Sequence, residues 1–144
     1  MNNPTSSTKP PASIAGKVAA ILLLGVVAFQ AALALGAPWG IATQGGANEG
    51  VLPDLLRVGN VITLVVYGAL AAVAGTALAS ANVRRRILYM AAAVMVPAAV
   101  LNLISPSIIE RIIWVPLTVA LVITLWRAAR DRSIAPVSRR ASIA

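Results

Sequence analysis

Two long runs without a charged side chain constrain this chain more than any other feature. They cover residues 58–83 and 87–109, and each exceeds the roughly 20 residues that a helix needs to cross the hydrocarbon core of a bilayer. Only 11% of the 144 residues are charged, whereas a soluble domain carries about a quarter. The sequence therefore predicts an integral membrane protein.

Two further apolar stretches complete the pattern. It predicts an all-α fold, a bundle of four transmembrane helices, with spans at about 15–36, 57–82, 87–105 and 108–127 and an outer loop at 37–56. Gly36 and Pro38 indicate where the first span ends. The turn at 84–86 is short, so the second and third helices are expected to be antiparallel neighbours.

Residues 15–131 would form this single transmembrane domain, between two tails. Residues 1–14 are rich in Pro, Ser and Thr, which predicts disorder, and residues 132–144 form a basic C-terminal tail. The first span, preceded by Lys17 and ending in Ala32-Leu33-Ala34, also resembles a cleavable signal peptide. It is longer than the apolar core of such a peptide, which favours a retained span.

The basic residues predict the orientation. Ten of the twelve lie on one side of the predicted membrane: Lys9, Lys17, Arg84, Arg85, Arg86, Arg127, Arg130, Arg132, Arg139 and Arg140. Cytoplasmic segments are enriched in Lys and Arg, so both termini are predicted to be cytoplasmic. The basic tail is expected to contact anionic lipid. No folded basic face with stacking aromatic residues is evident, so nucleic acid is not an expected partner.

Missing residue types narrow the chemistry. The chain has no Cys and no His, which removes thiol chemistry, thiolate metal sites and the commonest general base. No catalytic, cofactor-binding or metal-binding residues are predicted, no cofactor is expected, and the protein is expected not to be an enzyme. No ionisable group is placed at mid-membrane depth, which disfavours proton-driven export.

Neutral polar residues do occur inside the spans. They are Gln30, Thr63, Tyr67, Thr76, Asn102, Thr118 and Thr124. Such side chains commonly hydrogen-bond between helices. Gln30 and Asn102 both lie toward the outer half of the membrane, so they are candidates for a bond between the first and third helices. Pro97 and Pro116 interrupt the last two spans and should kink them.

Polar and aromatic residues gather at the predicted outer surface, where they form a possible recognition cluster. Its members are Trp39, Asp54, Arg57, Asn102, Ser105, Ser107, Glu110, Arg111 and Trp114. Ser107 and Glu110 also match a capping box, in which Glu110 would bond back to the Ser107 amide. The cluster is either a set of helix caps and interface anchors or a docking site for a lipid headgroup, a ligand or a partner protein.

Small residues recur at four-residue spacing on the second span. They form a possible helix-packing face of Gly68, Ala71, Ala72, Gly75 and Ala79. Such spacing allows helix backbones to approach closely in lipid. An Ala-rich chain also produces it by chance.

Several short motifs resemble an uncharacterised family of small bacterial four-helix integral membrane proteins. They are residues 36–40 (GAPWG), Gly45-Gly46, Val51-Leu52-Pro53 with Leu56-Arg57, and residues 102–116, from Asn102 through Ser105, Ser107, Glu110-Arg111 and Trp114 to Pro116. This chain has Gln44 where that group often carries Trp. The resemblance implies a bacterial inner membrane and this topology, and it implies no activity.

Two classes of function fit these observations. The first is a non-enzymatic accessory or self-associating subunit that acts through protein or lipid contacts, with a membrane-protein partner or a second copy of itself. The second is a small oligomeric transporter, pore or holin-like protein, which the two proline-containing helices and the basic tail suggest.

Overall fold

The computed structural model describes residues 11–131. Within that range the chain is all-helical and contains no strand. The long helices are α1 (Ile14–Ala34), α2 (Asp54–Gly75), α3 (Ala81–Leu103) and α4 (Ile108–Arg130), and two short 3₁₀ turns, η1 (Gly40–Ala42) and η2 (Gln44–Gly46), lie between α1 and α2. The predicted four-helix fold is confirmed. Most of the N-terminal tail and all of the C-terminal tail lie outside the described residues.

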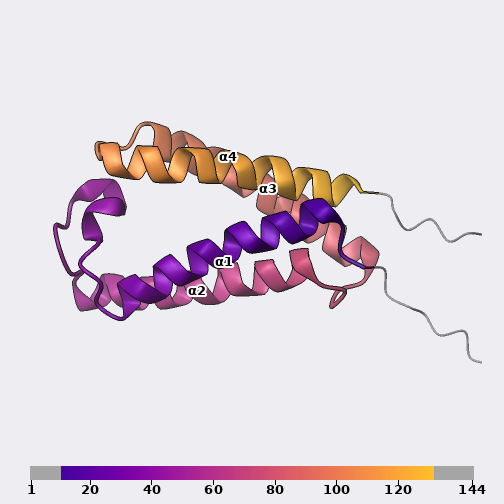
Figure 1. Cartoon of the computed structure of the whole chain (residues 1–144), viewed down its shortest axis with the longest axis horizontal. Coiled ribbons are helices and arrows are strands. Elements are labelled where there is room, and N and C mark those ends of the chain that lie inside the picture. Colours follow the sequence, from indigo (N-terminus) through magenta and orange to yellow (C-terminus); the bar gives the residue numbers. More distant parts are fainter. Residues whose placement is uncertain (1–10, 132–144) are drawn as a thin grey trace, which may run out of the picture.

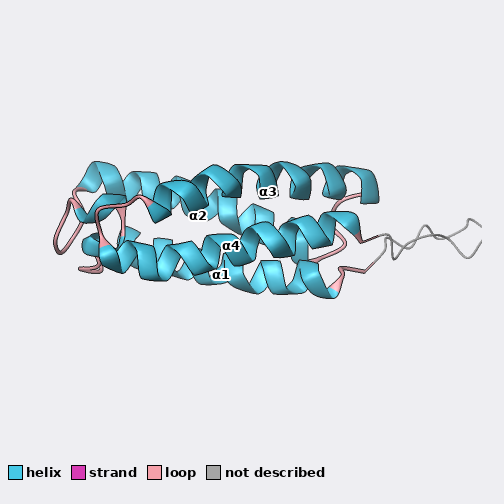
Figure 2. Ribbon diagram, turned by 90° about the horizontal axis from the view of Figure 1, so that it is seen from above, coloured by secondary structure: helices cyan, strands magenta, loops and turns pink. Residues whose placement is uncertain are grey.

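The four helices form an up-and-down bundle made of two antiparallel pairs (Figures 1 and 2). α1 packs along α2, α3 packs along α4, and the two pairs meet through α1 and α4. The first residue of α1 and the last of α4 lie at the same end of the bundle. We call this end, which carries Lys17 and Arg84, the basic end, and the opposite end, which carries the segment 35–53, the loop end.

The second and third helices pack much less than the sequence suggested. They run antiparallel, but α2 and α3 share few contacts, although only five residues join them. The small residues near the end of α2 face α1 instead, so close packing joins α2 to α1. The ring of helices is therefore α2–α1–α4–α3, and its loosely closed side lies between α2 and α3.

The boundary between these two helices also differs from the prediction. α2 ends at Gly75, not near residue 82, because Thr76 has an extended backbone and its hydroxyl donates to the Ala72 carbonyl at 2.7 Å. α3 then begins at Ala81, after Ser80. The three arginines at 84–86 consequently lie in the first turns of α3 and not in a connecting turn.

Side chains pack into a core only in the half of the bundle toward the basic end. The buried cluster contains Ala19, Leu23, Val26, Ala71, Ala74, Leu88, Ala92, Met95, Leu121, Leu125, Ala128 and Ala129. Most of these residues come from the first half of α1 and α3 and the second half of α2 and α4. The opposite half contains no comparable cluster among the described residues, and the two helix pairs are further apart there (Figure 1).

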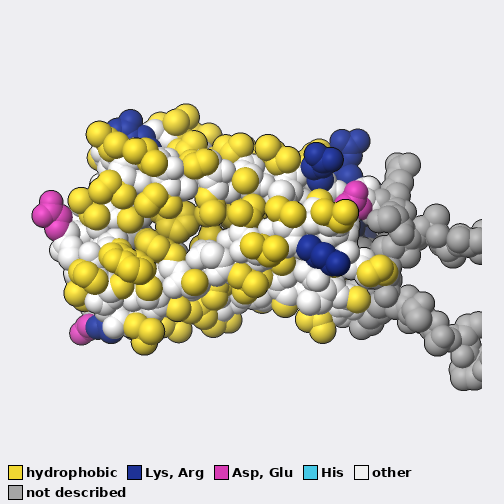
Figure 3. Space-filling model, in the orientation of Figure 1, with side chains coloured by type: hydrophobic (Ala, Val, Ile, Leu, Met, Phe, Trp, Pro, Cys, Tyr) yellow, Lys and Arg dark blue, Asp and Glu magenta, His cyan; other side chains and the backbone are white. Residues whose placement is uncertain are grey.

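The outer surface suits a bilayer. All four helices are long and apolar enough to cross a membrane. Large hydrophobic side chains remain exposed along them, for example Ile62 and Val65 on α2 and Leu101 on α3. On the face shown in Figure 3, Lys and Arg lie toward the two ends, and the middle is mainly hydrophobic. Exposing this much apolar surface to water would be unfavourable, whereas contact with lipid tails carries no such cost.

The predicted small-residue face is divided by the structure. A Cβ built on Gly75 would lie 2.8 Å from the Ala20 Cβ of α1, and Ala71 is buried. Gly68 has nothing within 4 Å of a built Cβ, and Ala79 lies beyond the end of the helix. Part of the face, around Ala71 and Gly75, therefore joins α1 to α2 within one chain.

Candidate functional site

The segment 35–53 folds over the loop end as an ordered cap, and we call it the outer cap. It begins where Gly36, with a φ of 97°, terminates α1 and its amide bonds back to the Leu33 carbonyl. The Gly40 amide donates to the Gly50 carbonyl at 2.9 Å and closes the segment on itself. A Cβ on Gly40 would lie 2.3 Å from the Asn48 carbonyl oxygen, so only glycine fits there.

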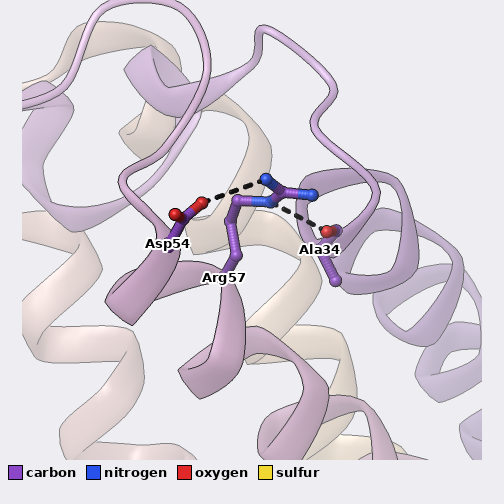
Figure 4. Close-up of polar contacts among 3 residues, drawn as sticks. All are labelled: Ala34, Asp54 and Arg57. Carbon is purple, nitrogen blue, oxygen red and sulfur yellow. Dashed lines mark hydrogen bonds and ion pairs between the residues drawn. The ribbon is translucent and has the colours of Figure 1, made fainter.

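Arg57 links the two helix ends that flank the outer cap (Figure 4). Its Nε donates to the Ala34 carbonyl at 2.9 Å, one of the last carbonyls of α1, and its Nη1 lies 3.2 Å from the Asp54 carboxylate. The Asp54 side chain is 97% exposed, so the ion pair itself contributes little to stability. Arg57 therefore joins the end of α1 to the start of α2.

Three contacts from α4 and its N-cap fasten the outer cap. The Ser107 hydroxyl donates to the Ile41 carbonyl at 2.9 Å, and the Trp114 indole N–H donates to the Ala42 carbonyl at 2.6 Å. The Gly45 amide donates to Oε2 of Glu110 at 2.8 Å. Gly45 presents this amide with a φ of 72°, a conformation that favours glycine.

Glu110 is buried, with 9% of its surface exposed, and is not a surface cap. Oε2 accepts bonds from the Gly45 amide and the Ser105 hydroxyl. Half of the predicted capping box is present, because the Ser107 hydroxyl accepts from the Glu110 amide at 3.2 Å. The other half is wrong: the Ser107 amide donates to Ser105 Oγ, and the Glu110 carboxylate bonds to the outer cap. The bond from the Gly45 amide to the Glu110 carboxylate replaces the predicted local bond from the Ser107 amide.

A cavity of about 190 Å³ lies below the outer cap, in the half of the bundle that lacks a packed core. All four helices and the outer cap contribute to its wall. The lining residues are Val26, Gln30, Thr43, Thr63, Tyr67, Met95, Ala98, Asn102, Glu110, Trp114, Leu117, Thr118 and Leu121. A cavity of about 150 Å³ can hold benzene, so this one can hold a molecule with one ring.

The predicted bond between Gln30 and Asn102 does not form. Both residues line the cavity, but Oε1 of Gln30 is buried without a hydrogen-bond partner. The hydroxyls of Thr63 and Thr118 bond to carbonyls of their own helices, Gly59 at 3.0 Å and Trp114 at 2.6 Å. These polar side chains therefore face the cavity and do not join neighbouring helices.

The predicted recognition cluster is divided into three groups. Asn102, Glu110 and Trp114 line the cavity. Arg57 and Asp54 join helix ends, Ser107 holds the outer cap, and the buried Ser105 bonds to Glu110. Trp39 and Arg111 stay exposed, although Trp39 stacks on Phe29 with ring centroids 6.1 Å apart. Phe29 also contacts Trp114 edge-on at 4.8 Å. The sequence grouped these residues because all lie near the same predicted membrane surface. In the structure, some of their side chains face the cavity and others face outward.

Gln30, Thr63, Tyr67 and Thr118 belong to the site but were not predicted to form one. A signal was present in α2, where Thr63 and Tyr67 are four residues apart and so share a helix face. That face meets Gln30 of α1 and Glu110 of α4 only because of how the two helix pairs pack. Local sequence patterns do not predict this packing.

A second buried polar group lies at the basic end. Arg84 is 7% exposed, and its Nη2 donates to the Ala74 carbonyl of α2 at 3.0 Å. The same atom lies 2.7 Å from where a Cβ on Gly16 of α1 would be. The sequence counted Arg84 only as an orientation signal. In the structure it joins α3 to the ends of α1 and α2.

Among the described residues, no group of side chains has the composition of a metal site. Comparisons with protein-family models, curated proteins and solved structures find no match to this chain. The likeness to small bacterial four-helix membrane proteins therefore stays a prediction. Its motifs nevertheless have a shared location, because Gly36, Gly40 and Gly45 build the outer cap, and Ser107, Glu110 and Trp114 hold it.

Proposed function

We propose that this protein is a membrane-embedded binding protein for small amphiphilic molecules, of the transporter class and without catalytic activity. One observation carries the proposal: a cavity with both polar and apolar walls lies inside the bundle, below an ordered cap, and all four helices line it. Ligand sites in helical proteins commonly lie between helices and combine an apolar wall with a few polar groups.

The arrangement of the helices supports a route into this cavity. α2 and α3 pack least among neighbours in the ring, so a molecule dissolved in the bilayer would enter between them. The tight α1–α2 and α3–α4 pairs and the packed core leave less room elsewhere. Small motions that separate the two pairs would open the site without breaking either pair.

The membrane and the orientation are part of the proposal. The charge asymmetry favours a cytoplasmic basic end, and the family resemblance favours a bacterial inner membrane. The cavity would then lie in the outer half of that membrane, and the outer cap would face the extracytoplasmic side.

An accessory subunit is a second candidate, favoured by the exposed part of the loop end. Trp39, Asp54 and Arg111 remain exposed there, and an aromatic ring beside charged groups is suited to protein contacts. Crosslinking in cells should recover a specific membrane partner or a homo-oligomer that a Trp39→Ala, Arg111→Ala variant loses. Unchanged crosslinks in that variant would remove this candidate.

The binding proposal is tested on the purified full-length protein with single-ring probes. Benzyl alcohol, benzylammonium and benzoate are each added in detergent, and the melting temperature is measured. At least one probe should raise it, because a molecule that binds only the folded state stabilises that state. Ala98 lines the cavity and Ala93, on the same helix, is exposed. Ala98→Phe should abolish the effect by filling the cavity, and Ala93→Phe should preserve it.

Two results would overturn this proposal. One is that no probe raises the melting temperature of the unmodified protein. The other is that Ala98→Phe and Ala93→Phe respond alike, which would place binding outside the cavity. Where a probe does bind, its uptake into proteoliposomes should exceed that into empty vesicles if the protein is a transporter.

A further inference from the structure

The cavity is lined by a buried carboxyl group that has no ion-pair partner among the described residues. Glu110 is 9% exposed and lines the cavity, yet among residues 11–131 the one ion pair joins Arg57 to Asp54. Arg111 is adjacent in sequence but exposed. The Gly45 amide and the Ser105 hydroxyl stabilise one oxygen of the carboxylate. These two donors and the N-terminal turn of α4 stabilise the carboxylate in part, and a cation beside it would add the ionic partner that it lacks.

Several hydrogen-bonding groups around Glu110 present acceptors to the cavity. The Thr63 and Thr118 hydroxyls donate to backbone carbonyls of their own helices, and the Trp114 N–H donates to the Ala42 carbonyl. Each hydroxyl oxygen therefore keeps lone pairs that can accept. Gln30 Oε1 is a buried acceptor without a partner. A ligand that carries donors can bond to these acceptors, while the Asn102 amide and the Tyr67 hydroxyl in the same lining also offer donors.

The remaining wall accommodates an apolar group. Val26, Met95, Leu117 and Leu121 line the deeper part, which adjoins the packed core. Tyr67 and Trp114 add aromatic rings to the lining. Aromatic faces attract cations as well as apolar groups. The wall thus combines an anionic acceptor-rich region with an apolar and aromatic region.

We propose that this cavity selects small organic cations, namely protonated amines that carry one apolar or aromatic group. The ammonium would lie between Glu110 and Gln30, and its apolar group would contact Met95 and Leu121. This inference rests on the proposed binding function and adds the charge of the ligand. The ammonium can belong to a free amine or to the headgroup of an aminophospholipid, because both present the same donors.

The test compares two probes of almost equal shape. Benzylammonium is protonated at neutral pH and benzyl alcohol is neutral, and each is titrated calorimetrically into the full-length protein at pH 7. Benzylammonium should bind at least tenfold more tightly. In Glu110→Gln, which keeps an oxygen for the Gly45 amide, the two probes should bind with equal affinity. Glu49 is exposed on the outer cap, so Glu49→Gln is the matched control and should keep the preference.

Gln30→Met is a second variant that leaves Glu110 and the outer cap intact. It removes the unpartnered acceptor at similar volume, so it should weaken benzylammonium, which brings a charged donor, severalfold more than benzyl alcohol. If Glu110→Gln does not fold, this variant and the two probes on the unmodified protein still decide the question.

Equal affinity for the two probes, or a preference that survives Glu110→Gln, would overturn the inference. The binding proposal would stand in that case, provided that benzyl alcohol binding is lost in Ala98→Phe. Absence of binding by both probes would instead remove the proposed function itself.

A last comparison identifies the source of the ammonium. Benzylammonium is titrated in two kinds of nanodisc with the same proportion of phosphatidylglycerol: one contains phosphatidylcholine, whose headgroup has no N–H donor, and the other phosphatidylethanolamine. A weaker apparent affinity with phosphatidylethanolamine supports the inference with a lipid headgroup as ligand. Equal affinity in both supports it with a free amine.

Discussion

Glu110 and Arg84 show how single side chains hold this bundle at its two ends. Each is buried, each bonds to a backbone group of another segment, and each comes from the first turns of its helix. Both were assigned surface roles from sequence, because charged residues at span ends usually reach water. Burial became possible because a neighbouring backbone offered a partner: the Gly45 amide for Glu110 and the Ala74 carbonyl for Arg84.

Replacing Arg84 should destabilise the fold. Arg84→Met leaves the Ala74 carbonyl without its donor, and an unsatisfied buried acceptor costs about 1–3 kcal/mol. The free energy of unfolding, measured by titration with a denaturing detergent, should fall by this amount. Arg86 is exposed and two residues away, so Arg86→Met should change it little. Equal effects of the two substitutions would mean that Arg84 has no structural role beyond its charge.

At the scale of elements, the close pairing of α1 with α2 depends on small residues. A Cβ on Gly75 meets Ala20 at 2.8 Å, whereas a Cβ on Gly68 meets nothing within 4 Å. Both glycines lie in α2, Gly68 in its interior and Gly75 at its last residue, and they differ in what surrounds them. This difference makes them a matched pair.

Gly75→Val should therefore separate the two helices, and Gly68→Val should not. Overpacking typically costs about 1–3 kcal/mol, and Gly75→Val should lower the unfolding free energy by that amount. Gly68→Val should leave the monomer unchanged. If Gly68→Val is the more damaging substitution, the predicted packing face serves a second chain and not α1.

The outer cap is an element whose attachment can be measured directly. Trp114→Phe removes the N–H that donates to the Ala42 carbonyl at 2.6 Å and keeps a ring beside Phe29. Amide hydrogen exchange over residues 40–46 should become faster, because local opening costs less when a bond is lost. Trp126→Phe, at the basic end, is the control. Exchange that is unchanged in Trp114→Phe would show that this bond does not hold the cap.

At the scale of the whole molecule, the orientation in the membrane is a prediction that cysteine labelling can test directly. It contains no Cys, so single cysteines can be introduced without background. Glu49→Cys at the loop end should react with a membrane-impermeant maleimide added to intact cells. Arg86→Cys at the basic end should react only after permeabilisation. The opposite pattern would invert the topology and place the cavity in the cytoplasmic half.

The whole bundle combines a packed half with a hollow half. The buried cluster lies mainly toward the basic end, and the cavity adjoins it toward the loop end. Cavities in proteins cost stability, because their walls lose contacts. Here the outer cap covers the hollow end and is bonded to Glu110, Ser107 and Trp114, while the core packs the helices together at the other end.

Much of the fold was predictable from the sequence. α1 and α4 begin and end within about three residues of the predicted spans, because apolar length, Gly36 and Ser107 are local signals. The end of α2 was not predictable from apolar length, since residues 76–83 are uncharged and could continue a span. The Thr76 hydroxyl and the Arg84 side chain satisfy the last carbonyls of α2 and so end it seven residues earlier than predicted.

The candidate site was only partly predictable. Asn102, Glu110 and Trp114 were selected from sequence, since polar and aromatic residues at span ends stand out. Gln30, Thr63 and Thr118 were interpreted as helix–helix contacts, because a neutral polar residue in a span gives the same signal whether it faces a helix or a cavity. Which of the two it faces depends on how the helices rotate and pair.

By itself the sequence determined that this chain forms four helices long and apolar enough to cross a membrane, because apolar length and backbone hydrogen bonding are local properties. Only the tertiary structure decided which helices pair, that Glu110 and Arg84 are buried, and that a cavity lies below the outer cap. Those outcomes depend on contacts between distant residues, such as Gly45 with Glu110 and Gly75 with Ala20. In a chain that is apolar nearly all round each helix, hydrophobicity does not distinguish one packing from another, so shape and a few buried hydrogen bonds make the choice.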